Sequence, residues 1–240
     1  MVDPDIQVHM LRTYVWLRRL MAIVTGVFLV TLSAYRELGA DPVTRNSISA
    51  YYYHKHDDFP MKDIYVATLC ALALLLVAYQ GYRNSESWAL DIGGLALLCV
   101  VFFPMEMPSP DENVQAKDRT PTSVHAVVHT ISALIFFGSI AYVSIFRAKD
   151  TLAAVSSPTR RAAYRRTYEV IGVLMLLVPG LAFVLHFVVK LESTVFWVEY
   201  IAVAVFLSYW LVKSAELALT GVETKDRVNA LPVTEPKRAP

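Results

Sequence analysis

Six long apolar runs recur along the chain, and they constrain its fold more than any other feature. A helix needs about 20 apolar residues to cross the hydrocarbon core of a bilayer. In lipid each segment must satisfy its own backbone hydrogen bonds, so we predict helices although the runs are rich in Val, Ile and Phe. The sequence therefore predicts an all-α, polytopic transmembrane bundle of six helices, with spans at about 16–35, 64–82, 88–103, 124–146, 168–189 and 195–212.

The composition agrees with a membrane protein of one domain. The chain is 55% hydrophobic and 18% charged, whereas soluble domains are about 45–50% apolar and about 25% charged. We expect a transmembrane domain over 16–216, a cytoplasmic N-terminal segment over 1–15 and a disordered cytoplasmic tail over 217–240, which is too poor in large apolar groups to fold alone. A net charge of +1 gives no basic face for nucleic acid, so we expect no such partner.

The distribution of Lys and Arg predicts the orientation. Of the 22 basic residues, fifteen fall on the side that holds both termini, and such residues are retained in the cytoplasm near helix ends. Both termini are therefore predicted to be cytoplasmic. Arg18 and Arg19 are expected to reach the lipid headgroups from the start of the first span. Four Trp residues are expected to act as interfacial anchors at helix ends: Trp16, Trp88, Trp197 and Trp210.

Titratable and hydroxyl side chains gather on the opposite, outer side. The stretch 47–63, between the first two spans, holds many of them. His125 and His129 are spaced i, i+4 on one face of the fourth span, and His186 lies near the outer end of the fifth. Two such imidazoles can bind one Zn²⁺, and a catalytic site adds a third ligand and a water whose pKa falls to about 7. We therefore interpret His125, His129 and His186 as candidate zinc ligands.

The remaining outer residues have candidate roles around this metal. Asp63 or Glu199 would take the proton of the bound water, and Ser47, Ser49 or Tyr52 would polarise a substrate carbonyl. The candidate catalytic residues are thus Asp63, Glu199, Ser47 and Ser49, and the candidate substrate contacts are Tyr51, Tyr52 and His54.

Each of these residues could also have a purely structural role, and the sequence does not decide between the structural and the functional role. Histidines inside a bundle also hydrogen-bond between helices. Asp63 could cap the second span, where a carboxylate satisfies free N–H groups. Glu199 could pair with a histidine or a Tyr hydroxyl. The HExxH pattern is absent, since position 126 is Ala, so no zincin is indicated.

Several motifs carry a family resemblance. Ser47-Ile48-Ser49-Ala50-Tyr51-Tyr52, Asp63, Phe196-Trp197-Val198-Glu199 and the segment 208–213 resemble uncharacterised bacterial six-helix membrane proteins of the DUF998 type. The Ser-Ile-Ser-Ala segment is more distantly similar to the damage-regulated autophagy modulator group, which is linked to lipid handling and the remodelling of lipid anchors. Ser49, Asp63, His186 and the His125/His129 pair look like elements of the alkaline ceramidase and adiponectin-receptor hydrolases, although there the HxxxH pair is on the last of seven helices.

Two classes of function follow from these patterns. The first is a protein of the bacterial inner (plasma) membrane whose outer pocket binds a membrane lipid or lipid-like substrate, and hydrolyses or remodels it through a His/Asp metal site. The second is a non-enzymatic small carrier, proton-coupled sensor or assembly partner, in which the outer histidines exchange protons. The sequence leaves open whether the chain is an enzyme and whether it forms a homo-oligomer.

Overall fold

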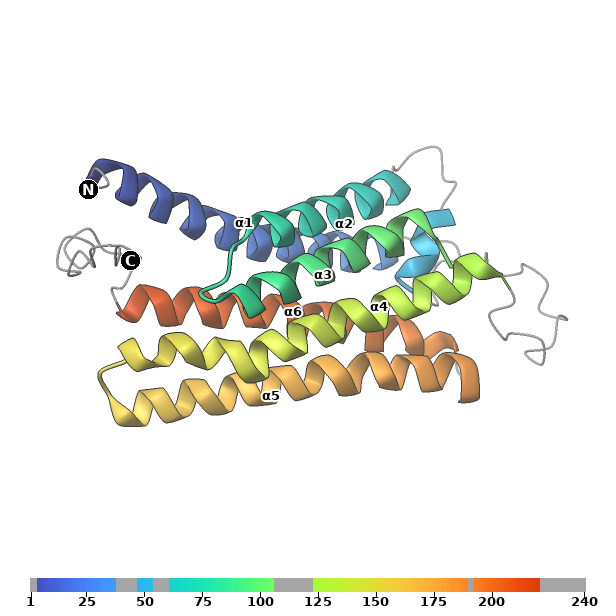
Figure 1. Ribbon diagram of the computed structural model, residues 1–240. Coiled ribbons are helices and arrows are strands. Elements are labelled where there is room, and N and C mark those ends of the chain that lie inside the picture. Colours follow the sequence, from blue (N-terminus) through green and yellow to red (C-terminus); the bar gives the residue numbers. More distant parts are fainter. Residues whose placement is uncertain (1–3, 38–46, 54–60, 106–122, 190–191, 221–240) are drawn as a thin grey trace, which may run out of the picture.

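Helices make up nearly all of the described structure (Figure 1). The computed structural model describes residues 4–37, 47–53, 61–105, 123–189 and 192–220, and no strand occurs among them. Six helices in this part are long and apolar enough to cross a membrane, which confirms the all-α transmembrane fold. The main helices are α1 (Pro4–Glu37), α2 (Met61–Ala78), α3 (Asn84–Phe102), α4 (Val124–Tyr142), α5 (Pro158–Phe183) and α6 (Glu192–Thr220).

The helices are longer than the predicted spans at several ends. α1 begins at Pro4 and α6 ends at Thr220, whereas the apolar runs begin near 16 and end near 212. A hydropathy pattern marks only the part of a helix that meets lipid, so polar turns beyond the bilayer escape it.

Short segments of irregular helix adjoin these elements. α4 continues as a π-helical segment η4 (Val143–Arg147) and a 3₁₀-helical segment η5 (Ala148–Ala154). α5 continues as a second π-helical segment, η6 (Val184–Val189), and a short 3₁₀ helix η2 spans Ser49–Tyr53.

The six helices form a closed ring. Each helix contacts the next one along the chain, and α1 also contacts α6. The first turn of α1 and the last turn of α6 lie at the same end of the bundle, which we call the terminal end (Figure 1). Segment η2 and the first turn of α4 lie at the opposite end, the distal end.

The bundle presents apolar side chains both inward and outward. Two hydrophobic clusters fill the interior: a large one that includes Met21, Phe136 and Trp210, and a smaller one near η2 that includes Tyr51 and Phe196. Large apolar side chains are also exposed on every main helix: Val30, Leu74, Leu95, Ile131, Leu177 and Leu211. This outer surface is what a lipid environment requires.

The four tryptophans occupy two kinds of environment. Trp16, Trp88 and Trp197 are exposed, and their role as interfacial anchors stays a prediction. Trp210 is instead fully buried, and its ring packs edge-on against Tyr79 and Tyr209. Its prediction as an interfacial anchor was wrong because position along a helix does not show which face a side chain occupies.

Candidate functional site

The polar segment 47–53 folds onto the distal end of the bundle through local and long-range contacts. The Ser47 and Ile48 carbonyl oxygens accept hydrogen bonds from the N–H groups of Ala50 and Tyr51, and these bonds lead into η2. Five residues then form what we call the distal polar cluster: Ser47, Ser49, Tyr65, His129 and Glu199.

Glu199 fixes the start of this segment to α6. The Ser47 hydroxyl donates to the Glu199 carboxylate at 2.9 Å, and the Ile48 N–H donates to the same carboxylate at 2.6 Å. The Ser49 N–H lies 3.1 Å from the Ser47 Oγ. Hydrogen bonds from N–H and O–H groups are what a carboxylate needs when water is excluded. Glu199 therefore organises the backbone that carries Ser49.

His129 joins α3 to the same segment. Its Nδ1 lies 3.0 Å from the carbonyl oxygens of both Val100 and Phe103. These carbonyls belong to the C-terminal end of α3, where helix geometry leaves them without intrahelical donors. Carbonyl oxygens only accept, so Nδ1 carries the proton and the imidazole caps α3.

This tautomer leaves the second ring nitrogen as an acceptor toward Ser49. Nε2 lies 3.2 Å from the Ser49 Oγ, so in the neutral ring the serine hydroxyl donates to it. His129 is buried, whereas Ser49 is half-buried. The Tyr65 side chain, which is also buried, hydrogen-bonds Ser49 from α2. The arrangement is a serine next to an oriented base, which is the geometry of an activated nucleophile.

The other predicted site residues lie apart from this pair. Tyr51 is fully buried and packs against the rings of Tyr35 and Phe196. Tyr52 is half-buried, with the Lys62 ammonium 4.8 Å from its ring centroid. Asp63 is exposed in the first turn of α2.

The predicted zinc ligands occupy different environments. His125 is exposed in the first turn of α4, and its ring packs against Phe103, while both ring nitrogens of buried His129 already have partners. His186 lies in η6, but its side chain, like His54 as a whole, lies outside the described residues. Within the described part of the chain, no three His, Cys, Asp or Glu side chains form a group that could hold a metal ion. The zinc site stays a prediction.

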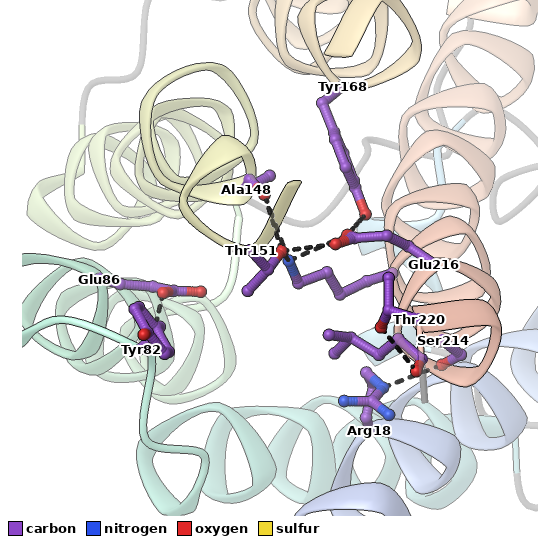
Figure 2. Close-up of polar contacts among 11 residues, drawn as sticks. Arg18, Tyr82, Glu86, Ala148, Thr151, Tyr168, Ser214, Glu216 and Thr220 are labelled. Carbon is purple, nitrogen blue, oxygen red and sulfur yellow. Dashed lines mark hydrogen bonds and ion pairs between the residues drawn. The ribbon is translucent and has the colours of Figure 1, made fainter. Parts of the chain in front are cut away.

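A second polar cluster, drawn in Figure 2, includes Lys213 and Glu216 near the end of α6 and so lies toward the terminal end of the bundle. Six residues form this terminal polar network: Arg18, Glu86, Thr151, Tyr168, Lys213 and Glu216. Glu216 accepts the Tyr168 hydroxyl at 2.6 Å, the Thr151 hydroxyl at 2.6 Å and the Lys213 ammonium at 3.2 Å. Lys213 uses its remaining donors on the Thr151 Oγ1 at 2.6 Å and the Ala148 carbonyl at 3.3 Å. The ion pair is therefore fully hydrogen-bonded, as buried charges require.

Two further charged residues border this ion pair. The Arg18 Nε donates to the Ser214 Oγ at 3.2 Å, and the Glu86 carboxylate accepts the Tyr82 N–H at 2.8 Å (Figure 2). Glu86 lies in the first turn of α3, and its bond to Tyr82 ties that turn to the segment just before the helix. The network joins α1, α3, α5 and α6 with the η5 segment.

Sequence reasoning missed the terminal polar network. Arg18 and Lys213 are only 2% and 3% exposed. The prediction that Arg18 reaches the headgroups was therefore wrong. Lys213, which counted only toward the predicted orientation, instead forms a buried ion pair with Glu216. Lys213 and Glu216 are spaced i, i+3 inside a long apolar helix, and an ionisable pair at such a position is a signal for a buried function.

A family model describes most of this chain. The model described as "Protein of unknown function (DUF998)" matches residues 14–215. The chain belongs to the DUF998 family. No curated protein and no solved structure matches it. The matched part of this DUF998 protein contains the whole distal polar cluster and, except for Glu216, the whole terminal polar network. The resemblances to the autophagy modulator group and to the ceramidase and adiponectin-receptor hydrolases gain no support from these comparisons.

Proposed function

We propose that this DUF998 protein is a membrane-embedded acyl hydrolase or acyltransferase that acts on lipid esters at the distal end of the bundle. The observation that carries the proposal is the contact between Ser49 Oγ and His129 Nε2, with Nδ1 held by the two carbonyl oxygens at the end of α3. A hydroxyl is a weak nucleophile until an adjacent base takes its proton, and the base must be held in the right tautomer. The backbone carbonyls serve here as that orienting group.

The chemistry follows from these positions. His129 Nε2 takes the Ser49 proton while Oγ attacks the ester carbonyl carbon, and the same nitrogen then gives the proton to the departing alcohol. Water or a second alcohol attacks the resulting acyl-serine and regenerates the hydroxyl. The Tyr65 hydroxyl, which hydrogen-bonds Ser49, is the candidate donor to the developing oxyanion.

Membrane lipid is the proposed substrate class because of where the pair lies. His129 is in the second turn of α4, about 7 Å along the helix axis from its first residue at about 1.5 Å per residue. We propose that the first turn of α4 lies at the membrane surface, so that this depth is near the boundary where lipid ester groups meet the hydrocarbon. We further propose that the distal end faces outward and that both termini are cytoplasmic, in a bacterial inner membrane, on the charge distribution described above.

A covalent probe tests the proposal directly. The purified protein in lipid nanodiscs is treated with a long-chain alkyl fluorophosphonate, and the modified serine is located by peptide mass spectrometry. We expect labelling of Ser49, loss of labelling in Ser49→Ala, and strong reduction in His129→Gln. Ser208→Ala is the matched control, since the Ser208 hydroxyl donates to the Val205 carbonyl within α6.

Two outcomes of this experiment would sink the proposal. One is no labelling of folded protein, and the other is labelling that persists in Ser49→Ala. Release of free fatty acid from phospholipid vesicles, measured with the same variants, then separates a hydrolase from a transferase that needs an acceptor alcohol.

A non-enzymatic carrier or proton-coupled sensor is the second candidate function. One observation favours it: the polar groups of Ser47 and Ser49 already hydrogen-bond to Glu199, His129 and Tyr65. Such bonds would hold the segment in place if it closed a pathway for a proton or a small solute. Here the segment 47–53 would act as a gate without covalent chemistry. Folded protein that resists the probe, but whose proton uptake in vesicles is lost in Glu199→Gln, would favour this candidate.

A further inference from the structure

The end of α4 is an unusual stretch of helix beside the terminal polar network. A single continuous run passes from α-helix to π-helix at Val143 and to 3₁₀ helix at Ala148. The Ala148 N–H bonds to the carbonyl of Val143, five residues back. π-Helical turns within α-helices are rare, and they occur frequently at functional sites.

Side chains of α6 and the backbone of α5 hold this irregular stretch in place. The Ala148 carbonyl accepts from Lys213, and the Thr151 hydroxyl bridges Lys213 and Glu216 (Figure 2). The Ser144 hydroxyl, in the π-helical segment, donates to the Tyr168 carbonyl of α5 at 2.8 Å. The irregular backbone therefore depends on partners from two other helices.

A buried ion pair adds little net stability to a fold. Well-packed apolar residues of similar volume often stabilise a fold as much or more, whereas a satisfied charged network can select one arrangement over others. Removal of the π turn would change the register of η5 by one residue. A shift of one residue rotates a helical position by about 100°, which would carry Thr151 away from α6.

We propose that the terminal polar network is a conformational lock. It holds η4 and η5 in the irregular form seen here, and a second conformation exists in which this stretch regains α-helical register and η5 leaves the Lys213–Glu216 pair. The lock is independent of the proposed acyl chemistry at the distal end, because it involves none of the residues of the distal polar cluster.

Distance measurement between two spin labels tests the lock. In a Cys70→Ser/Cys99→Ser background, labels are attached to Lys149→Cys in η5 and Ala218→Cys in α6, both of which are exposed positions. Double electron–electron resonance is recorded on the full chain in lipid nanodiscs. The key variant is Thr151→Val, which keeps the shape of the side chain and both charges but removes the bridging hydroxyl.

We expect Thr151→Val to raise the population at a second distance by about five- to tenfold, as loss of one buried hydrogen bond would. Thr167→Val is the matched control, because the Thr167 hydroxyl donates only within α5, to the Ala163 carbonyl, and it should leave the distance distribution unchanged. Glu216→Gln, which removes the charge but keeps the shape, provides a second test and should give the same second distance.

Size-exclusion chromatography and the unfolding midpoint establish that each labelled variant is folded. If Thr151→Val and Glu216→Gln lower the unfolding midpoint but keep the distance distribution of Thr167→Val, the network is purely structural and the lock is overturned. The lock is equally overturned if the two variants change neither quantity.

Discussion

The carboxylate of Glu199 accepts the backbone N–H of Ile48 at 2.6 Å, so a side chain of α6 holds a segment that lies about 150 residues earlier in the chain. A buried N–H without a partner costs about 1–3 kcal/mol. The Glu199 carboxylate therefore helps to fix the position of Ser49 through the backbone of segment 47–53, and substitution of Glu199 measures this dependence.

Glu199→Ala should lower the free energy of unfolding by about 2–4 kcal/mol, because Ser47 and Ile48 both lose their acceptor. Denaturant unfolding in detergent micelles measures the loss. Asp63→Ala, at an exposed carboxylate of the same end, should change the free energy by less than about 0.5 kcal/mol. Equal effects of the two substitutions would contradict the role given to Glu199.

His129→Ala should cost about 2–3 kcal/mol of stability, since it leaves the carbonyls at the end of α3 without a donor. His125→Ala is the matched substitution at an exposed ring on the same helix, and we expect a change of less than about 0.5 kcal/mol there. Thermal unfolding, followed by tryptophan fluorescence, compares the stability of the two variants. A larger effect of the substitution at His125 would favour the predicted role of that residue as a metal ligand over that of an exposed side chain that adds little to stability.

Gly172→Ala should strongly destabilise the contact between α5 and the end of α4. A Cβ at Gly172 would overlap the Ile145 Cγ1 and lie 3.1 Å from the Ala141 carbonyl oxygen, and overpacking of this kind costs about 1–3 kcal/mol. Gly180→Ala on the same helix has no described heavy atom within 4 Å of its new Cβ. It should be neutral or slightly stabilising. The unfolding midpoints of the two variants provide the comparison, and similar midpoints would be inconsistent with close packing at Gly172.

Lys213→Met alone should cost about 3–5 kcal/mol, because the Glu216 charge remains buried without its cation. The double variant Lys213→Met/Glu216→Leu should recover most of that loss, since no net charge is then left in the interior. A double-mutant cycle on the free energy of unfolding gives the coupling between the two residues. Additive effects of the single substitutions would show that the ion pair contributes no coupling.

The sequence predicts the class of fold well because lipid imposes so few solutions. Apolar runs of spanning length must be helices in a bilayer, and all six were found. The exact ends were less predictable. Polar turns such as those at the start of α1 extend a helix without changing its hydropathy signal, and the π and 3₁₀ turns after Tyr142 have no periodicity that marks them.

Four of the five residues of the distal polar cluster could be singled out from the sequence, but their contacts could not. Ser49, His129 and Glu199 were identified because each is a polar side chain at one predicted depth. Which of them meet depends on helix rotation and on the path of the segment 47–53, and neither can be read from spacing. Tyr65 was missed because a tyrosine near a helix end is ordinary in a membrane protein. Lys213 was counted only as a sign of orientation, and Glu216 was missed because the last predicted span, 195–212, ends before both residues.

The Lys213–Glu216 pair also restricts how this sequence can change over generations. Substitution of either residue alone strongly lowers stability, because its partner would be left as an isolated buried charge. In relatives of this chain that align with both positions, substitutions of Lys213 and Glu216 should therefore occur together. The two positions are therefore under one shared constraint, although each can mutate separately.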